Sequence, residues 1–245
     1  MTYNNAIEVC GLCKCYDGKK VVEHLNFTVP SGALFALLGV NGAGKTTTIR
    51  MLCGLTKPDQ GDAFLSGHSI TADAVTVKAN IGVSPQENAV APGLSVRENL
   101  ELIAELMLLD KEETKQRVEN ILDELSLRSC EKTPAKKLSG GYQRRLSIAM
   151  ALVSKPGILF LDEPTLGLDV LARRELWNFL KKLKGKITIL LTTHYMEEAQ
   201  ELADIVGLMF DGRMRATGTV QQLCERTGRQ SLEEAFLVYA QEETL

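Results

Sequence analysis

The stretch Gly39–Thr47, which reads GVNGAGKTT, follows the apolar run Ala33–Leu38 and precedes a helix-like segment that ends near Leu52. Its glycines let the backbone turn tightly, so that successive N–H groups can point at one anion. The helix that follows adds the positive end of its dipole at the same place. The stretch therefore predicts a phosphate-binding loop that joins a buried strand to a helix.

Two side chains at the end of this loop suit nucleotide chemistry. Lys45 can reach the terminal phosphates of a nucleotide, and the hydroxyl of Thr46 can bind Mg²⁺. The competing interpretation is a glycine-rich turn before an ordinary core helix, but the strand-loop-helix context weighs against it. The loop alone does not identify the class of nucleoside triphosphatase, so the later motifs must identify it.

Length and composition set limits on the function. With 245 residues, of which 44% are hydrophobic, the chain fits one large domain or a domain with a subdomain. The net charge of −3 argues against a nucleic-acid partner. No apolar run approaches the roughly 18 to 20 residues that span a bilayer, so a membrane role needs a partner. The N-terminus lacks the features of a secretion signal, and we expect a cytosolic location.

Strand patterns and helix patterns occupy different parts of the chain. Strand patterns occur at residues 6–38, Ile158–Leu161 and Ile187–Leu191. From Ser95 onward, about 45 residues show helical periodicity and no strand signal. Capping boxes are predicted at Ser95, Thr219 and Ser231. The pattern indicates an α/β fold with a helical subdomain inserted between strands of a nucleotide-binding core.

Polar residues follow several of the predicted strands. Asp162 and Glu163 are adjacent carboxylates at a strand end, which are costly unless a cation such as Mg²⁺ or Lys45 offsets them. Asp162 suits a metal ligand, and Glu163 can polarise an attacking water. A lone His is usually a packing residue, but His194 ends a strand at the same rim, which favours a γ-phosphate contact. Position alone leaves Gln86 as either a site residue or a loop residue.

A second candidate anion site lies in Leu138–Arg145, which reads LSGGYQRR and opens an apolar helix. Ser139, Gly140 and Gly141 offer a hydroxyl and backbone N–H groups at the helix start. The competing interpretation is a simple N-cap with flexible glycines. One nucleotide is not easily held by both this site and the phosphate loop within one fold.

Taken together, the motifs resemble those of the ATP-binding cassette (ABC) ATPases over essentially the whole chain. The matching features, in chain order, are the phosphate loop, Gln86, Leu-Ser-Gly-Gly, the Leu-Asp-Glu-Pro-Thr strand end, Leu168-Asp169 and His194. Within that family, Thr193–Ala199 and Leu232–Leu237 are similar to stand-alone ATPase subunits of the drug-resistance and sodium-export branch.

The resemblance implies a single ABC nucleotide-binding domain over residues 1–245. Its fold would be α/β, with a P-loop NTPase core of RecA-like mixed sheet and flanking helices, an antiparallel β subdomain and an inserted α-helical subdomain. The core with the β subdomain would comprise residues 1–86 and 157–218. Residues 87–156 would form the helical subdomain with the signature motif, and 219–245 the C-terminal helices.

The resemblance also implies a role for each candidate residue, with ATP and Mg²⁺ as ligands. Tyr16 would stack on adenine, and the phosphates would be wrapped by Asn41, Gly42, Ala43, Gly44, Lys45, Thr46 and Thr47. The Mg²⁺ ion would be held by Thr46, Gln86 and Asp162. The catalytic residues would be the base Glu163, the switch His194, Gln86 and Lys45. The ATP of the opposite subunit would be contacted by Ser139, Gly140 and Gly141, with Asp169 lining the dimer seam. One position departs from the common signature, because Tyr142 stands where Gln is frequent and Gln143 follows it.

These roles describe an ATPase that dimerises head to tail on two ATP molecules, with itself or with a related ATPase. Motion would pass from Gln86 and the loop after it into a separate integral membrane permease at the cytoplasmic face of the membrane, and the branch implies export. A binding-only module is disfavoured by the intact catalytic set. DNA-repair members carry a long coiled coil and translation members usually two cassettes, and neither feature is present. A soluble ATPase that acts in cofactor or complex assembly remains the alternative.

Overall fold

The computed structural model describes residues 5–87 and 89–241 of the chain. The chain separates into two units, one formed by Met1–Ala79 with Lys184–Leu245 and the other by Asn80–Leu183. Within the described ranges, no helix combines the length and the apolar character that crossing a membrane requires.

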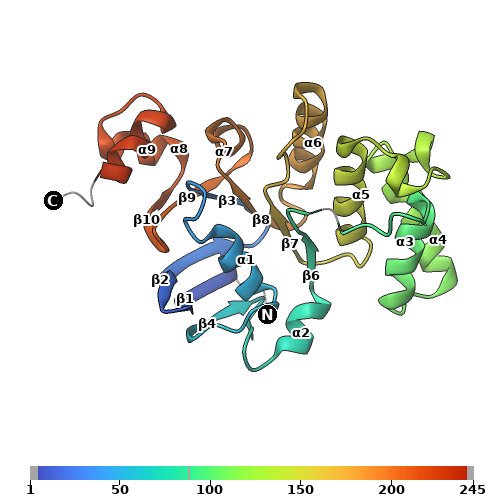
Figure 1. The fold of residues 1–245 in the computed structure, drawn as a ribbon, viewed down its shortest axis with the longest axis horizontal. Coiled ribbons are helices and arrows are strands. Elements are labelled where there is room, and N and C mark those ends of the chain that lie inside the picture. The colour runs from blue at the N-terminus through green and yellow to red at the C-terminus, as the bar shows by residue number, and fades with distance from the viewer. Residues whose placement is uncertain (1–4, 88, 242–245) are drawn as a thin grey trace. The chain divides into compact units, whose positions relative to one another are not determined.

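An antiparallel sheet forms the beginning of the first unit, with strand order β2-β1-β4-β5 (Figure 1). Its strands are β1 (Asn5–Tyr16), β2 (Lys19–Pro30), β4 (Gln60–Leu65) and β5 (His68–Ser69). Buried and exposed residues alternate along the second half of β2, as expected for a strand with one face on a core. The β1 strand departs from simple alternation because its pairing with β2 contains register shifts, one of them between Val9 and Leu12.

A mixed sheet forms the rest of the core of this unit. In it β3 (Leu34–Leu38) lies between two parallel neighbours, β8 (Thr188–Thr193) and β9 (Ile205–Phe210), and β10 (Arg213–Gly218) pairs antiparallel with β9. Every residue of β3 and β8 is buried, as parallel strands covered on both faces should be. The rings of Phe27 and Phe35 stack at 5.1 Å and join the two sheets. The helices of this unit are α1 (Lys45–Leu52), α2 (Ala74–Ala79), α7 (Met196–Leu202), α8 (Val220–Thr227) and α9 (Leu232–Gln241).

The second unit combines two parallel strands with helices. The strands are β6 (Ile81–Ser84) and β7 (Ile158–Asp162). The helices are α3 (Val96–Leu106), α4 (Lys111–Glu124), α5 (Gly140–Leu152) and α6 (Val170–Leu183), with short 3-10 turns η1 (Arg128–Cys130) and η2 (Ala135–Lys137). The helices between β6 and β7 confirm the predicted helical insertion between strands, and the two sheets confirm the α/β class.

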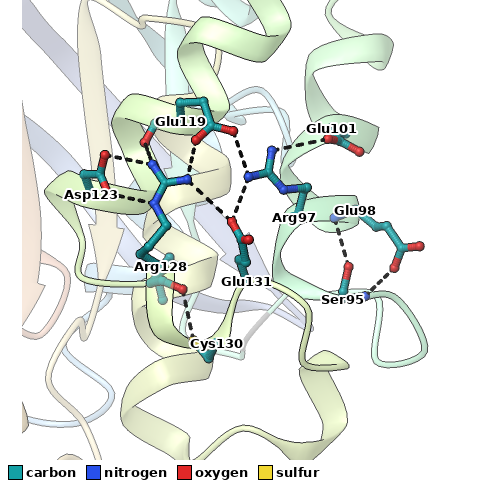
Figure 2. A network of polar contacts seen from close by, with 10 residues as sticks. Ser95, Arg97, Glu98, Glu101, Glu119, Asp123, Arg128, Cys130 and Glu131 are labelled. Carbon is teal, nitrogen blue, oxygen red and sulfur yellow. Dashed lines mark hydrogen bonds and ion pairs between the residues drawn. The ribbon is translucent and has the colours of Figure 1, made fainter.

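An ion-pair network joins α3, α4 and η1 within this unit (Figure 2). Arg128 contacts the carboxylates of Glu119 and Asp123, and Arg97 lies 2.8 Å from Glu119 and 2.7 Å from Glu131. Since Glu119 is shared by both arginines, the network links three consecutive segments of the chain. Its members are partly exposed, so its contribution depends on geometry and on salt.

Candidate nucleotide-binding site

The phosphate loop runs from the end of β3 to the start of α1. Gly44 is the N-cap of α1 with φ of 100°, and Gly42 has φ of 84°, so both occupy backbone conformations that favour glycine. A Cβ on Gly44 would lie 2.6 Å from the carbonyl oxygen of Val21. A Cβ on Gly39 would collide with the carbonyl oxygen of Met209. A Cβ on Gly42 would meet no atom within 4 Å. The loop is therefore packed against β2 and β9 on one side and is open at Gly42.

Lys45 is buried at the first turn of α1 and bends back over this loop. Its Nζ donates to the carbonyl oxygen of Gly39 at 2.8 Å and to that of Val40 at 3.2 Å. The ammonium group is thus held above the loop whose backbone N–H groups the sequence assigned to phosphate. The first turn of α1 contains no acidic residue that would compete for these donors.

The pairing of β3 with β8 brings His194 to the phosphate loop. Leu38 lies opposite Thr193 in the parallel ladder, and the N–H of Gly39 donates to the carbonyl oxygen of Thr193 at 3.3 Å. His194 is the next residue, and its half-buried ring lies against that of Tyr195, with centroids 4.1 Å apart. Two residues 155 positions apart, Gly39 and His194, therefore meet at one edge of the sheet, as the strand order requires.

Tyr16 ends β1 at the turn into β2. Its ring is exposed, and the ammonium of Lys14 lies 5.5 Å from the ring centroid. The start of β2 packs on the phosphate loop, because Val21 approaches Gly44 closely. The hairpin end that carries Tyr16 is therefore anchored beside the loop with an aromatic face open to solvent.

In the second unit, a parallel pair of strands brings three more candidate residues together. Ser84 of β6 lies opposite Leu161 of β7, so Gln86 follows one strand where Asp162 ends the other and Glu163 follows it. Asp162 is 4% exposed and Glu163 is 6% exposed, whereas Gln86 is exposed. Glu163 has φ of 48°, a left-handed conformation that is unusual for a residue with a Cβ.

The signature stretch starts α5 as predicted. Ser139 is its exposed N-cap, and the hydroxyl accepts from the N–H of Tyr142 at 3.5 Å. A Cβ on Gly140 would meet nothing within 4 Å, whereas one on Gly141 would lie 3.2 Å from the Cβ of Ala172. The helix start is therefore bare at Gly140 and tightly packed one residue later.

The departure at the fifth signature position has local consequences. The half-buried ring of Tyr142 lies under the guanidinium of Arg145, 5.1 Å from its centroid. Gln143 turns back instead, and its Nε2 donates to the carbonyl oxygens of Ala135 and Leu138, each at 3.2 Å. The amide side chain thus holds the loop before the helix. Asp169 is exposed and caps α6 by accepting from the N–H of Ala172 at 2.9 Å.

Comparison with known proteins identifies the family. Residues 22–166 match the family described as "ABC transporter". The chain belongs to this family. It is 41% identical over 224 residues to the daunorubicin/doxorubicin resistance ATP-binding protein DrrA of Streptomyces peucetius, covering 91% of this chain and 68% of DrrA. It is 44% identical over 214 residues to the Nod factor export ATP-binding protein I of Burkholderia pseudomallei, covering 86% of this chain and 70% of that protein.

The solved structures agree with this assignment. The structure titled "Structure of ATP binding subunit of ABC transporter" superposes with a TM-score of 0.87 at 30% identity, covering 96% of this chain and 99% of that one. Membership confirms the resemblance, the P-loop fold class, and the prediction of an ATPase that uses ATP with Mg²⁺. Each unit also contains residues that suit this ion. Thr46 in the first unit offers a hydroxyl oxygen, and Gln86 and Asp162 in the second offer an amide and a carboxylate oxygen.

One buried residue next to the candidate site had no place in the sequence analysis. Arg144 of α5 is 3% exposed and donates to three backbone carbonyl oxygens, those of Pro85, Asp162 and Pro164. The available signal was a charged residue at the start of an apolar helix, directly after the signature. The sequence did not reveal the hydrogen-bond partners of Arg144, because every residue has a main-chain carbonyl group.

Proposed function

We propose that this ABC ATPase is the motor subunit of a membrane exporter and drives transport through a separate integral membrane permease. Two relatives with which it aligns over most of its length are named for drug resistance and for Nod factor export. These names support transport over the alternative of a soluble ATPase in cofactor or complex assembly. The observation that carries the ATP-driven part is the β3–β8 pairing, which sets His194 beside a loop with a buried lysine.

The proposed roles follow the geometry of each unit. In the first unit, the open backbone around Gly42 and the ammonium of Lys45 bind the phosphates of ATP, and Tyr16 stacks on adenine. His194 donates a hydrogen bond from a ring N–H to the γ-phosphate as the switch residue. The remaining phosphate-loop residues in this proposal are Asn41, Ala43, Gly44, Thr46 and Thr47.

The second unit supplies the groups that act on the attacking water. Glu163 accepts the proton from that water as general base, and Gln86 orients it. Asp162, Gln86 and Thr46 hold Mg²⁺, which neutralises charge on the phosphates when bound. Because Gly140 is exposed and unobstructed, the start of α5 is free to approach a phosphate of the ATP held by a second subunit. Ser139, Gly141 and Asp169 belong to the same proposed seam.

Two ATP molecules in such a dimer favour the closed state, and loss of the γ-phosphate contacts opens it. The division into a core, a helical subdomain at 87–156 and C-terminal helices after 218 remains a prediction. So does the location, which we propose to be the cytoplasmic face of the membrane, where the permease holds the ATPase. The second subunit in this proposal is either an identical copy or a related ATPase.

The test is purification of the tagged full-length chain from detergent-solubilised native cells, followed by reconstitution of any co-purified multi-span protein into vesicles. We expect a permease whose presence stimulates ATP hydrolysis, and no stimulated hydrolysis with the Glu163→Gln variant. A tagged chain that is absent from membranes and recovered only with soluble partners would overturn the transport proposal in favour of an assembly ATPase.

A further inference from the structure

Arg144 of α5 binds three main-chain carbonyl oxygens at the ends of two strands. Its Nε donates to the carbonyl oxygen of Pro164 at 3.0 Å, one terminal nitrogen donates to that of Asp162 at 2.7 Å, and the other donates to that of Pro85. All these groups belong to the unit Asn80–Leu183. One guanidinium therefore binds the ends of both strands, β6 and β7, from the helix that starts with the signature.

The three carbonyl oxygens bracket the residues proposed to act on the attacking water. Asp162 and Pro164 are the two neighbours of Glu163, and Pro85 directly precedes Gln86. The backbone of Glu163 is left-handed, a conformation that persists only where the surroundings fix it. Two hydrogen bonds from one rigid guanidinium, on either side of Glu163, contribute to that constraint.

We propose that Arg144 is a positioning residue for ATP hydrolysis, which fixes the backbone around Glu163 and the start of the Gln86 loop through these three carbonyl oxygens. The proposal rests on the proposed roles of Glu163 and Gln86. Arg144 itself does not touch the reacting atoms. Since α5 begins only four residues before Arg144, it also ties the signature end of that helix to the two strand ends.

Holding these three carbonyl oxygens requires the planar guanidinium of Arg144, whose N–H donors point in fixed directions. The guanidinium remains charged at every accessible pH, and its donors diverge in one plane toward three separate oxygens. A lysine ammonium keeps the charge but is a single point that cannot hold three separated carbonyl groups in one geometry. Arg144→Lys therefore separates the charge from the geometry, and Arg144→Gln removes the charge while keeping an amide donor.

The competing explanation is an ordinary buried arginine that only stabilises the unit. The chain offers a matched control in Arg117 of α4, whose guanidinium is partly buried and also binds backbone carbonyl oxygens. It donates to Leu152 at 2.7 Å and to Val153 at 3.2 Å, at the opposite end of α5. Arg117→Lys should therefore reproduce the stability effect of Arg144→Lys without its effect on the strand ends.

The experiment measures kcat, KM and ATP dissociation constants for the full-length chain and its variants, each assayed below its own unfolding transition. We expect Arg144→Lys to lower kcat by about 10- to 100-fold, the size expected when a catalytic group is misplaced. Its ATP affinity should stay within about twofold of the unsubstituted chain, because Lys45 and the loop around it are untouched. Arg144→Gln should show a similar loss, and Arg117→Lys should keep kcat within about twofold.

A double substitution distinguishes positioning from structure. If Arg144 acts through Glu163, adding Arg144→Lys to Glu163→Gln should lower the residual kcat by much less than the same change lowers it in the unsubstituted chain. A purely structural role predicts the same fold-loss in both backgrounds. Should Arg144→Lys be too unstable to assay, Arg144→Gln in the same two backgrounds gives the same comparison.

The outcomes separate the two proposals. An Arg144→Lys variant with unchanged kcat, or with a loss that Arg117→Lys matches, would overturn the positioning role while Glu163→Gln still removes most of the turnover. Full turnover by Glu163→Gln would instead refute the assignment of the base on which the positioning role depends.

Discussion

Replacing Glu163 by glycine should make the folded chain more stable than replacing it by alanine, although both changes remove the proposed general base. Glu163 has φ of 48°, and this conformation is strained for any residue that carries a Cβ. Alanine keeps the Cβ and therefore keeps the strain, whereas glycine relieves it. The comparison between the two variants cancels the loss of the carboxylate.

The magnitude follows from two opposing terms. A left-handed conformation costs a residue with a Cβ about 1 to 2 kcal/mol. Glycine loses about 0.5 to 1 kcal/mol more backbone entropy on folding than alanine does. At the middle of both ranges, Glu163→Gly should therefore exceed Glu163→Ala in the free energy of unfolding by about 0.8 kcal/mol. For a chain of this size, that corresponds to a difference of about 2 to 3 °C in Tm.

Thermal unfolding of both variants without nucleotide, followed by circular dichroism, measures the difference. The control is Gln116, an exposed residue inside α4, where glycine should be less stable than alanine by about 1 kcal/mol because the helix favours alanine. A Glu163→Gly variant that is less stable than Glu163→Ala, with the usual order at Gln116, would refute the claim that the backbone at Glu163 is held under strain.

Three further predictions concern the site and the ion-pair network. Glu163→Gln should lower ATP hydrolysis to a small residual rate and accumulate an ATP-dependent dimer in size-exclusion chromatography, and a monomer with normal turnover would contradict the assignment of the base. Gly39→Ala should lower ATP affinity at least about tenfold, because the new Cβ meets a backbone oxygen that cannot move aside, and calorimetric titration with ATP measures it. Arg128 lowers the pKa of Glu119 and of Asp123 through hydrogen bonds, so the folded state binds fewer protons than the unfolded state as these groups titrate. Stability that is present above the ordinary carboxyl pKa should be lost as the pH falls through the lowered values, and Arg128→Met should flatten the decline of the urea midpoint between about pH 5 and pH 2.

The parts of the fold that depend on residue type were predictable from the sequence. The phosphate loop was recognisable because Gly42 and Gly44 adopt positive φ angles, which few other residues tolerate. The capping boxes at Ser95 and Thr219 formed as predicted, because both partners lie within one helical turn. At Ser231 only half of the box formed, since the Glu234 carboxylate accepts from the N–H of Gln230 instead. A shift of one residue is beyond what the pattern can resolve.

Strand alternation was less reliable where the backbone is irregular. Cys13 is buried and Cys15 is exposed, although residues two apart in a regular strand face the same side. The pairing of β1 with β2 shifts register between Leu12 and Lys14 and again before Cys15, which rotates the later side chains away from the core. Such bulges depend on how two strands pair, so the sequence of one strand alone does not predict them.

The same reasoning explains why the sequence pointed to Glu163 and Gln86 but not to what holds them. A candidate catalytic carboxylate can be recognised in a sequence because its chemistry belongs to its side chain. The residue type therefore indicates which catalytic role it can take. The partners of Arg144 are main-chain oxygens, which every residue possesses, so no choice of residue at positions 85, 162 or 164 records the contact. The Arg144 side chain is only 3% exposed, and burying its charge costs free energy. Only strong hydrogen-bond acceptors can offset that cost. A buried arginine beside a recognised motif is therefore a reason to look for strained backbone nearby, and in this chain that backbone is at the proposed general base.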